Sequence, residues 1–415
     1  MSADEPMSAH PERSAAAGGA KSKGTATPTP TSTPTPTPTT TTTLIRRPLL
    51  LLALLSACAT AQRPPSPSPT APVDRAPAAD LPPRLEFPPD DVKVSRLDLE
   101  LAGKNDEELF AIGTAAYGAA DYGRAAAAFA RLADLFPTSR HEAAALFDAG
   151  FAYERQDEWR LALERFRTIS RKYEGPDATE AAFRIAECQY HLRELADARA
   201  TLDRLVAQPD LSPGDRIRAL AQRGIVELED GKMEDAEKSL RLALATFRAA
   251  SEDERLDDHF AAQAQYYLGE VYREWFRALP LDPSKGDDAA LQRDLEHKAE
   301  MLLSAQGHYL RAIRMGNDRW AVASGFRIGG LYDELRSQLL DAPLPPGLDD
   351  EHQAAYRAEL RRRVRVLATK AITAYEQTLS RAARSGVDDL RFLGDAQGSL
   401  ERLKSAIADD VKPAM

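Results

Sequence analysis

The chain has 415 residues, a formal net charge of -10 and a hydrophobic content of 43%. This length allows one large or several small domains, and the acidity argues against binding to a phosphate backbone. There are only two cysteines, Cys58 and Cys188, and they are not expected to pair, so a disulfide or zinc framework is excluded.

The first 58 residues fall into two segments. Residues 1–43 are dominated by Ser, Ala, Thr and Pro, which cannot bury enough apolar surface to fold. Residues 44–58 contain two arginines, a short apolar run and a site of small residues, which is the layout of a secretory signal. Its apolar run is shorter than the roughly 20 residues that span a bilayer. Because such signals normally start close to their basic pair, we expect residues 1–43 to precede the true start of translation at Leu44.

The signal ends in Leu-Ser-Ala-Cys, which resembles the lipobox of bacterial lipoproteins. This resemblance implies that the signal is cut before Cys58, which then carries the lipid. The alternative is an ordinary signal peptide. Ala59 follows the cysteine, whereas Asp at that position retains enterobacterial lipoproteins in the inner membrane. The resemblance therefore implies a lipid anchor in the outer membrane, with the protein on its periplasmic face.

Residues 59–100 form a Pro-rich segment. Proline at this density favours extended, solvated polyproline II, which advances about 3 Å per residue. We expect a tether that holds a folded body away from the membrane. The folded body is expected to cover residues 101–409.

Three helix starts can be read from capping signals. Asn105 is followed by Glu108, and Asp177 by Glu180, at the spacing of a capping box. Ser212 precedes Pro213, which gives an N-cap with proline at the first helical position. These signals divide the body into helical hairpins.

The stretch from Ile112 to Pro137 shows a pattern that recurs along the body. An apolar residue precedes Gly113, an aromatic residue lies at the following turn, and Ala and Phe recur at helical spacing before Pro137. This arrangement resembles a tetratricopeptide (TPR) repeat. The equivalents of its glycine, here called marker residues, are Gly113, Gly150, Ala186, Gly224, Gly269 and Gly329. The resemblance implies an all-α fold, a right-handed α-solenoid of about six TPR-like hairpins.

The last two hairpins contain insertions. Leu279–Asp288 and Asp341–Asp350 combine Pro, Gly and Asp, so we expect exposed turns there, each followed by a long helix. Leu393 and Leu400 belong to a final amphipathic helix. Such a helix is expected to cap the solenoid and shield its last hairpin from water.

The sequence contains no motif of a nucleotide-binding site or of a nucleophilic hydrolase. His297 and His308 are eleven residues apart on one predicted helix, too far to share a metal. Paired aspartates lie next to loops or helix starts, where their negative charge interacts favourably with the helix dipole. We therefore expect no catalytic residue, no metal and no cofactor.

The TPR resemblance implies a groove lined by the first helix of each hairpin. The position three residues before the marker points into it and holds, in order, Phe110, Phe147, Phe183, Ala221, Tyr266 and Phe326. Further groove candidates on the same helices are Arg184, Glu187, Tyr267 and Arg327. One interpretation is a row of aromatic anchors for a partner segment. The other is that the rings are buried between neighbouring repeats.

Lipobox, tether and repeats together resemble the helical-repeat lipoproteins of the bacterial cell envelope. This resemblance implies a lipid-anchored, non-enzymatic scaffold that binds another envelope protein through the groove, in an assembly, secretion or motility complex. No nucleic acid is expected as a partner. The alternative is a cell-wall enzyme, or a subunit of one, built on an α-superhelix.

Overall fold

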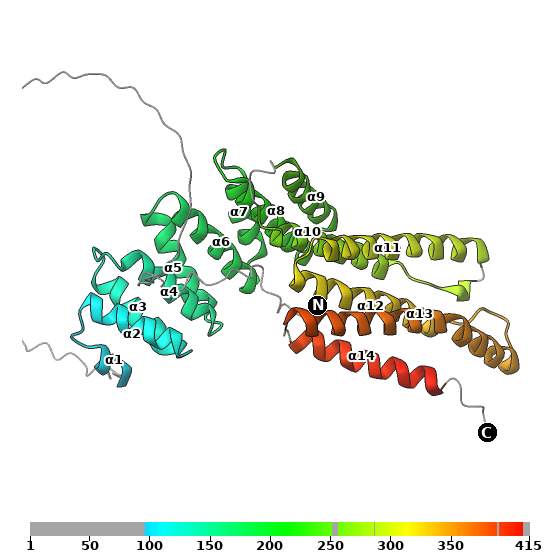
Figure 1. Ribbon diagram of the computed structural model, residues 1–415. Helices are drawn as coiled ribbons and strands as arrows, with labels where there is room; N and C mark the ends of the chain where they lie inside the picture. The colour runs from blue at the N-terminus through cyan, green and yellow to red at the C-terminus, as the bar shows by residue number, and fades with distance from the viewer. Residues whose placement is uncertain (1–95, 251–255, 286, 388–389, 410–415) are drawn as a thin grey trace, which may run out of the picture. The chain divides into compact units, whose positions relative to one another are not determined.

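The computed structural model describes residues 96–250, 256–285, 287–387 and 390–409, and their regular structure is entirely helical (Figure 1). The predicted all-α solenoid of helical hairpins is thereby confirmed. The predicted leader 1–43, the signal with Cys58 and most of the predicted tether lie outside the described residues. None of the described helices is both long and apolar enough to cross a membrane.

The helices form six consecutive hairpins between a short first helix and a final one. They are α1 (Arg96–Leu101), α2 (Asp106–Gly118) with α3 (Tyr122–Leu135), α4 (Glu142–Glu154) with α5 (Trp159–Lys172), α6 (Pro176–His191) with α7 (Leu195–Val206), α8 (Pro213–Glu229) with α9 (Met233–Ala249), α10 (His259–Ala278) with α11 (Asp288–Arg314), α12 (Asp318–Asp341) with α13 (Asp350–Ser385), and α14 (Leu390–Asp409). A short 3-10 turn, Pro283–Lys285, lies between α10 and α11. The second helix of each hairpin also packs on the first helix of the next, and α14 packs on α13 as the predicted cap.

The marker glycines allow the two helices of a hairpin to approach closely. A Cβ atom at Gly150 would lie 2.5 Å from the Phe166 ring, and one at Gly269 would lie 2.4 Å from the Tyr309 ring. Both distances are far shorter than a van der Waals contact, so only glycine fits. The same contact recurs between Gly113 and Phe129 and between Gly329 and Tyr375. The glycine pattern in the sequence therefore records helix packing.

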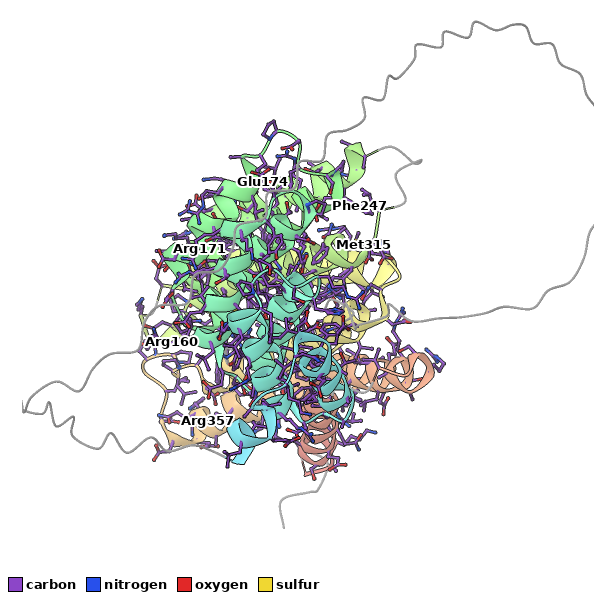
Figure 2. The ribbon with its side chains drawn as sticks, turned by 90° about the vertical axis from the view of Figure 1, so that its left-hand side faces the viewer. Arg160, Arg171, Glu174, Phe247, Met315 and Arg357 are labelled. Atoms are coloured by element: carbon purple, nitrogen blue, oxygen red, sulfur yellow. The ribbon has the colours of Figure 1, made fainter. Side chains whose placement is uncertain are left out.

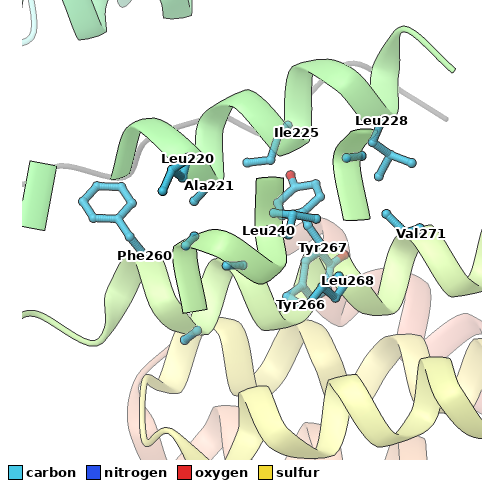
Figure 3. Packing of buried hydrophobic residues seen from close by; sticks show 14 of the residues in the cluster. Leu220, Ala221, Ile225, Leu228, Leu240, Phe260, Tyr266, Tyr267, Leu268 and Val271 are labelled. Atoms are coloured by element: carbon cyan, nitrogen blue, oxygen red, sulfur yellow. The ribbon is translucent and has the colours of Figure 1, made fainter. Parts of the chain in front are cut away.

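The largest buried cluster runs through the middle hairpins, where apolar side chains of α8, α9 and α10 meet (Figure 3). Leu220 and Ile225 of α8 face Leu240 of α9 and Leu268 of α10 in this region. Each hairpin thus buries its apolar residues against the next one along the chain. This is the packing that a solenoid requires, because a single hairpin cannot bury its apolar face alone.

The turn inside each of the first four hairpins uses one residue with positive φ, seven positions after the marker. These residues are Ala120, Asp157, Arg193 and Gly231, with φ between 58° and 74°. The amide of the next residue donates to a carbonyl five residues earlier, for example Asp121 N to Ala116 O at 2.9 Å. This is the Schellman closure of a helix end. Glycine adopts positive φ most easily, yet of these four turn residues only Gly231 is a glycine.

Replacing Ala120 with glycine should therefore stabilise the protein. An alanine at φ 58° carries a steric cost of about 1 kcal/mol that glycine avoids. We expect Ala120→Gly to raise the free energy of unfolding by about 0.5–1 kcal/mol in urea denaturation. The neighbour Ala119, at φ -88°, is the control, because glycine there should lower stability. An equal effect at both positions would contradict this interpretation of the turn.

Two of the three predicted helix starts are confirmed. Asn105 and Glu108 form a reciprocal capping box, with Glu108 N donating to Asn105 Oδ1 at 2.9 Å. Ser212 caps α8 as predicted, and its hydroxyl oxygen accepts from Asp215 N. The predicted box of Asp177 and Glu180 is wrong. The helix starts one residue before Asp177, at Pro176, and Glu180 binds arginines instead of the helix end.

The first insertion is not a free surface loop at its start. Lys298 of α11 is almost fully buried, and its Nζ donates to the carbonyl oxygens of Phe276 and Leu279, each at 2.6 Å. The same ammonium lies 4.3 Å from the centre of the Phe276 ring. A cation at the C-terminal end of α10 complements its dipole. The expectation of an exposed turn is thus wrong at Leu279.

Candidate functional site

The first helices α2, α4, α6, α8, α10 and α12 carry all predicted groove residues. We call the side of these helices that holds the positions three and two residues before each marker, from Phe110 to Arg327, the inner face. The rings at the first of these positions are more deeply buried than a row of anchors would be. Phe147 is 9% exposed, and Phe183 and Tyr266 are 0% exposed. Phe110 and Phe326 are partly buried.

Most of these rings pack against an aromatic ring of the second helix in the same hairpin. Ring centres are 5.7 Å apart for Phe110 and Phe129, and 6.2 Å apart for Phe147 and Phe166. Tyr266 with Tyr309, and Phe326 with Tyr375, repeat the pairing. In each case the second ring is the one that fills the space beside the marker glycine. The interpretation as free anchors is therefore wrong for the fully buried rings, which belong to the core.

Polar side chains of the inner face form a buried ion cluster between α4 and α6. Arg184 lies 3.6 Å from Glu154, 3.1 Å from Glu180 and 3.2 Å from Glu187. Its guanidinium also lies 4.9 Å from the centre of the Phe151 ring. Burial opposes a charged arginine, yet the three carboxylates outweigh it and raise the pKa of Arg184. The predicted residues Arg184 and Glu187 thus come together, as partners of each other.

The cluster continues onto α8 through Arg218. This arginine is 2% exposed, and it lies 2.5 Å from Glu180 and 3.9 Å from the centre of the Phe183 ring. Three consecutive hairpins are therefore joined by charged contacts on the inner face. Sequence reasoning missed Arg218, although arginine at this position among apolar neighbours could have indicated it.

A second cluster joins α10 and α12. Arg327 lies 3.0 Å from Glu270, and its Nε donates to the Tyr266 hydroxyl at 2.9 Å. Tyr309 donates its hydroxyl to the same carboxylate. Burial would raise the pKa of Glu270, but Arg327 and Arg273 lower it below its ordinary value. Tyr267, the remaining groove candidate, is buried against Trp320.

A hollow of 380 Å³ opens beside this second cluster. Side chains from α10, α12 and α14 line it, including the arginines Arg273, Arg277, Arg327 and Arg402. Each of these arginines lies within ion-pair distance of a carboxylate of α10 or α12. The hollow is therefore polar and internally neutralised.

Asp148 differs from these paired groups. It is half-buried on α4, and within the described ranges no hydrogen bond or ion pair reaches its carboxylate. Burial raises its pKa from the ordinary value to about 7. One oxygen of Glu154, six residues further on, is also buried without a hydrogen-bond partner. Helices α2 and α4 carry six carboxylates and no Lys or Arg, and four of these carboxylates pair with basic side chains outside the two helices.

The raised pKa makes a pH-dependent prediction. The folded state holds a proton on Asp148 that the unfolded chain has lost, so its contribution to stability falls as pH rises from about 4 to about 7. The substitution Asp148→Asn removes this pH-dependent contribution to stability, because an amide does not titrate. We expect the variant to exceed the wild type in unfolding free energy by on the order of 1–2 kcal/mol at pH 8, and to match it near pH 4. Urea denaturation at both pH values measures this, and a pH-independent difference would contradict it.

The described residues offer little for chemistry. Within them, no group of three or more His, Cys, Asp or Glu side chains could hold a metal ion. His308 is buried with Nδ1 3.0 Å from the side-chain oxygen of Gln265, and burial lowers its pKa to about 4. Cys188 is a free, buried thiol whose pKa is raised by burial. These groups are packed in the core and face no common cleft.

Comparison with known proteins agrees with the repeat pattern. Residues 147–216, which cover most of the second and third hairpins, match the family described as tetratricopeptide repeat. No curated protein matches the chain. Similar solved structures include the APC/C hetero-tetramer Cut9-Hcn1, with 14% identity and a TM-score of 0.41, over 74% of this chain and 46% of that one. This chain therefore spans less than half the length of that structure.

Two further structures are similar over most of their own length. The apo form of RapI has 12% identity and a TM-score of 0.41, over 73% of this chain and 99% of that one. A TPR repeats protein from Bacteroides fragilis has 13% identity and a TM-score of 0.27, over 56% of this chain and 98% of that one. The tetratricopeptide match covers residues 147–216, and the described part of the chain is built of helical hairpins throughout.

Proposed function

We propose that this repeat protein is a non-catalytic scaffold of the bacterial cell envelope, which binds a partner protein along the inner face of α2, α4 and α6. The proposal is carried by Asp148, a half-buried carboxylate without a hydrogen bond or ion pair in the described ranges. A buried acid in this state is stabilised as an anion by a nearby cation. A Lys or Arg side chain of a partner would supply that cation.

The surroundings of Asp148 support a basic partner segment. Four of the six carboxylates of α2 and α4 are paired with basic side chains outside these two helices, whereas no ion pair reaches Asp148 in the described ranges. Arg184 and Arg218 are themselves bound to Glu180. A basic segment would therefore meet Asp148 without competition from a cation of this chain. The buried aromatic rings keep these helices rigid, so that the polar residues are positioned before binding.

Chemical crosslinking in intact cells, followed by affinity purification and mass spectrometry, tests this proposal. We expect crosslinks between α2 or α4 and a segment of one envelope protein that contains Lys or Arg. Asp148→Asn should weaken the purified complex about tenfold or more, because a charge-assisted contact is lost. Exposed Asp134 on α3 is the control, since Asp134→Asn should leave affinity unchanged. An enriched partner that crosslinks only elsewhere, or unchanged affinity in Asp148→Asn, would contradict the inner-face site.

We also propose that the scaffold is anchored by a lipid on Cys58, in the outer membrane and facing the periplasm. The basic pair, the apolar run and the Leu-Ser-Ala-Cys end support lipidation, and Ala59 supports sorting to the outer membrane. The Pro-rich segment after Cys58 would hold the solenoid away from the bilayer.

Intact-mass measurement of the protein from membranes tests the anchor. We expect a mature chain that begins at an acylated Cys58. A chain that retains residues before Cys58 would contradict both the cleavage and the lipid. Density-gradient separation tests the location, and recovery only with the inner membrane would contradict the sorting proposal.

A further inference from the structure

The helices around α11 carry a second surface that the inner-face proposal does not use. Two hollows lie on either side of helix α11. The first, of 700 Å³, lies between α9, α10 and α11. The second, of 610 Å³, lies between α11, α12 and α13. We call these two hollows and the ridge of α11 between them the α11 surface.

Positive charge gathers in both hollows. Arg241, Arg248 and Arg311 line the first, and Lys370, Arg381 and Arg384 line the second. No Asp or Glu is among the described residues that line either hollow. The chain as a whole has a net charge of -10, so this concentration of positive charge is a local feature. A ligand with negative charge is therefore favoured at this surface.

Part of this charge is not neutralised by neighbours. Arg241 is bound to Glu237, and Arg381 lies 2.9 Å from Asp318. In contrast, within the described ranges no hydrogen bond or ion pair reaches the guanidinium of Arg311. Burial, followed by repulsion from Arg241 and Arg314, lowers the pKa of Arg311. Arg311 is thus a cation held among cations, and an incoming carboxylate would relieve the repulsion.

The same surface exposes large apolar side chains. Leu303 of α11 is 63% exposed at the first hollow, and Val366 of α13 is 57% exposed at the second. Leu310, about two helical turns after Leu303, is also exposed and lines the second hollow. Exposed apolar residues rimmed by polar ones are typical of protein interaction sites. Because they lie at hollows, they suit side chains that insert from a partner better than a flat bilayer.

Gly307 of α11 adds an independent observation. It lines the first hollow, and a Cβ atom there would meet only the flexible end of Arg311, at 3.5 Å. Unlike Gly269 and Gly329, it is not required by packing inside the molecule. A glycine inside a helix costs about 1 kcal/mol relative to alanine. Its absence of a side chain keeps the hollow open.

From this geometry we infer that the α11 surface binds an acidic segment of a partner protein that also carries apolar side chains. Its carboxylates would bind Arg248 and Arg311, and its apolar side chains would pack on Leu303 and Leu310. The site is separate from the inner face, so the protein could hold two partner segments at once. Neither proposal depends on the other.

Site-specific photo-crosslinking in the native cells, with the full chain, tests this inference. A benzophenone amino acid replaces Leu303, and an equally exposed apolar residue, Leu135 on α3, serves as the position control. We expect Leu303, but not Leu135, to crosslink to a protein segment with net negative charge and apolar residues. The crosslinked peptide is identified by mass spectrometry.

Three variants sharpen the test. Arg248→Glu with Arg311→Glu should reduce the crosslink about tenfold or more, since two charged contacts become repulsive. Gly307→Gln, which fills the hollow without changing charge, should also reduce it. Arg357→Glu with Arg361→Glu makes the same charge change on exposed α13 residues outside both hollows and should leave the crosslink intact. Thermal melting of each variant confirms that it is folded.

Four outcomes would overturn the inference. The first is no crosslink above the Leu135 control, and the second is a crosslink to a basic or uncharged segment. The third is an adduct with lipid, which would show that the surface lies on a membrane. The fourth is an equal loss in the two charge-reversal variants, which would show non-specific electrostatic attraction.

Discussion

Replacing Arg184 with alanine should lower the free energy of unfolding by about 3–5 kcal/mol. This side chain is buried, and it holds Glu154, Glu180 and Glu187 within 3.6 Å. Without it, three carboxylates remain close together and away from water, and Arg218 is bound to one of them, Glu180. Removal of one partner from a buried ion cluster costs far more than the loss of a surface pair.

Urea denaturation of Arg184→Ala measures this effect. Arg160 and Arg171 on α5 are exposed (Figure 2), and Arg171→Ala is a suitable control, with an expected change below about 0.5 kcal/mol. A loss near that of the control would show that the cluster contributes little to the fold.

Truncation of the aromatic rings on the inner face should also lower the free energy of unfolding strongly. We expect Phe183→Ala to cost about 3–5 kcal/mol of unfolding free energy, since the ring is 0% exposed and contacts the Arg218 guanidinium. Phe147→Ala should cost a similar amount. The two rings belong to different buried clusters, so the effects in the double variant should add.

Leu161→Ala on α5 is the control for this pair, because this leucine is 39% exposed and should tolerate truncation. Differential scanning calorimetry of the three variants gives the comparison. A double variant that melts like the wild type but no longer binds the envelope partner would contradict the core assignment. It would then restore the interpretation of the rings as binding anchors.

Much of the fold could be predicted because it depends on local signals. The marker glycines, the caps at Asn105 and Ser212, and the Pro and Gly between helices all act within one hairpin. Apolar residues at helical spacing then define which faces pack. These features depend on near neighbours in the chain, so a single sequence reveals them.

Other features depend on contacts between hairpins and were not predictable. Glu180 has the spacing of a capping residue, yet Arg184 and Arg218 bind it more strongly than the helix end does. The burial of Phe183 depends on how closely α8 approaches α6, which no local pattern specifies. The turn residue Arg193 has positive φ because the hairpin requires it, although arginine does not favour that conformation.

The same limit applies to the sites. The acidic character of α2 and α4 is visible in the sequence, but the lack of a partner for Asp148 is not. The α11 surface combines residues of α9, α11 and α13, and those of α9 and α13 are more than a hundred residues apart. Only the packing of three hairpins brings them to one side of the molecule.

The most direct test of the inner-face scaffold is the affinity of the crosslink-identified partner for purified wild type and Asp148→Asn, measured about one pH unit below the pKa of Asp148, near pH 6, at physiological salt. Isothermal titration calorimetry gives both dissociation constants. We predict about a tenfold or greater weakening in Asp148→Asn, with proton release on binding to the wild type because Asp148 becomes ionised. Equal dissociation constants without proton release would contradict the claim that the partner binds at Asp148.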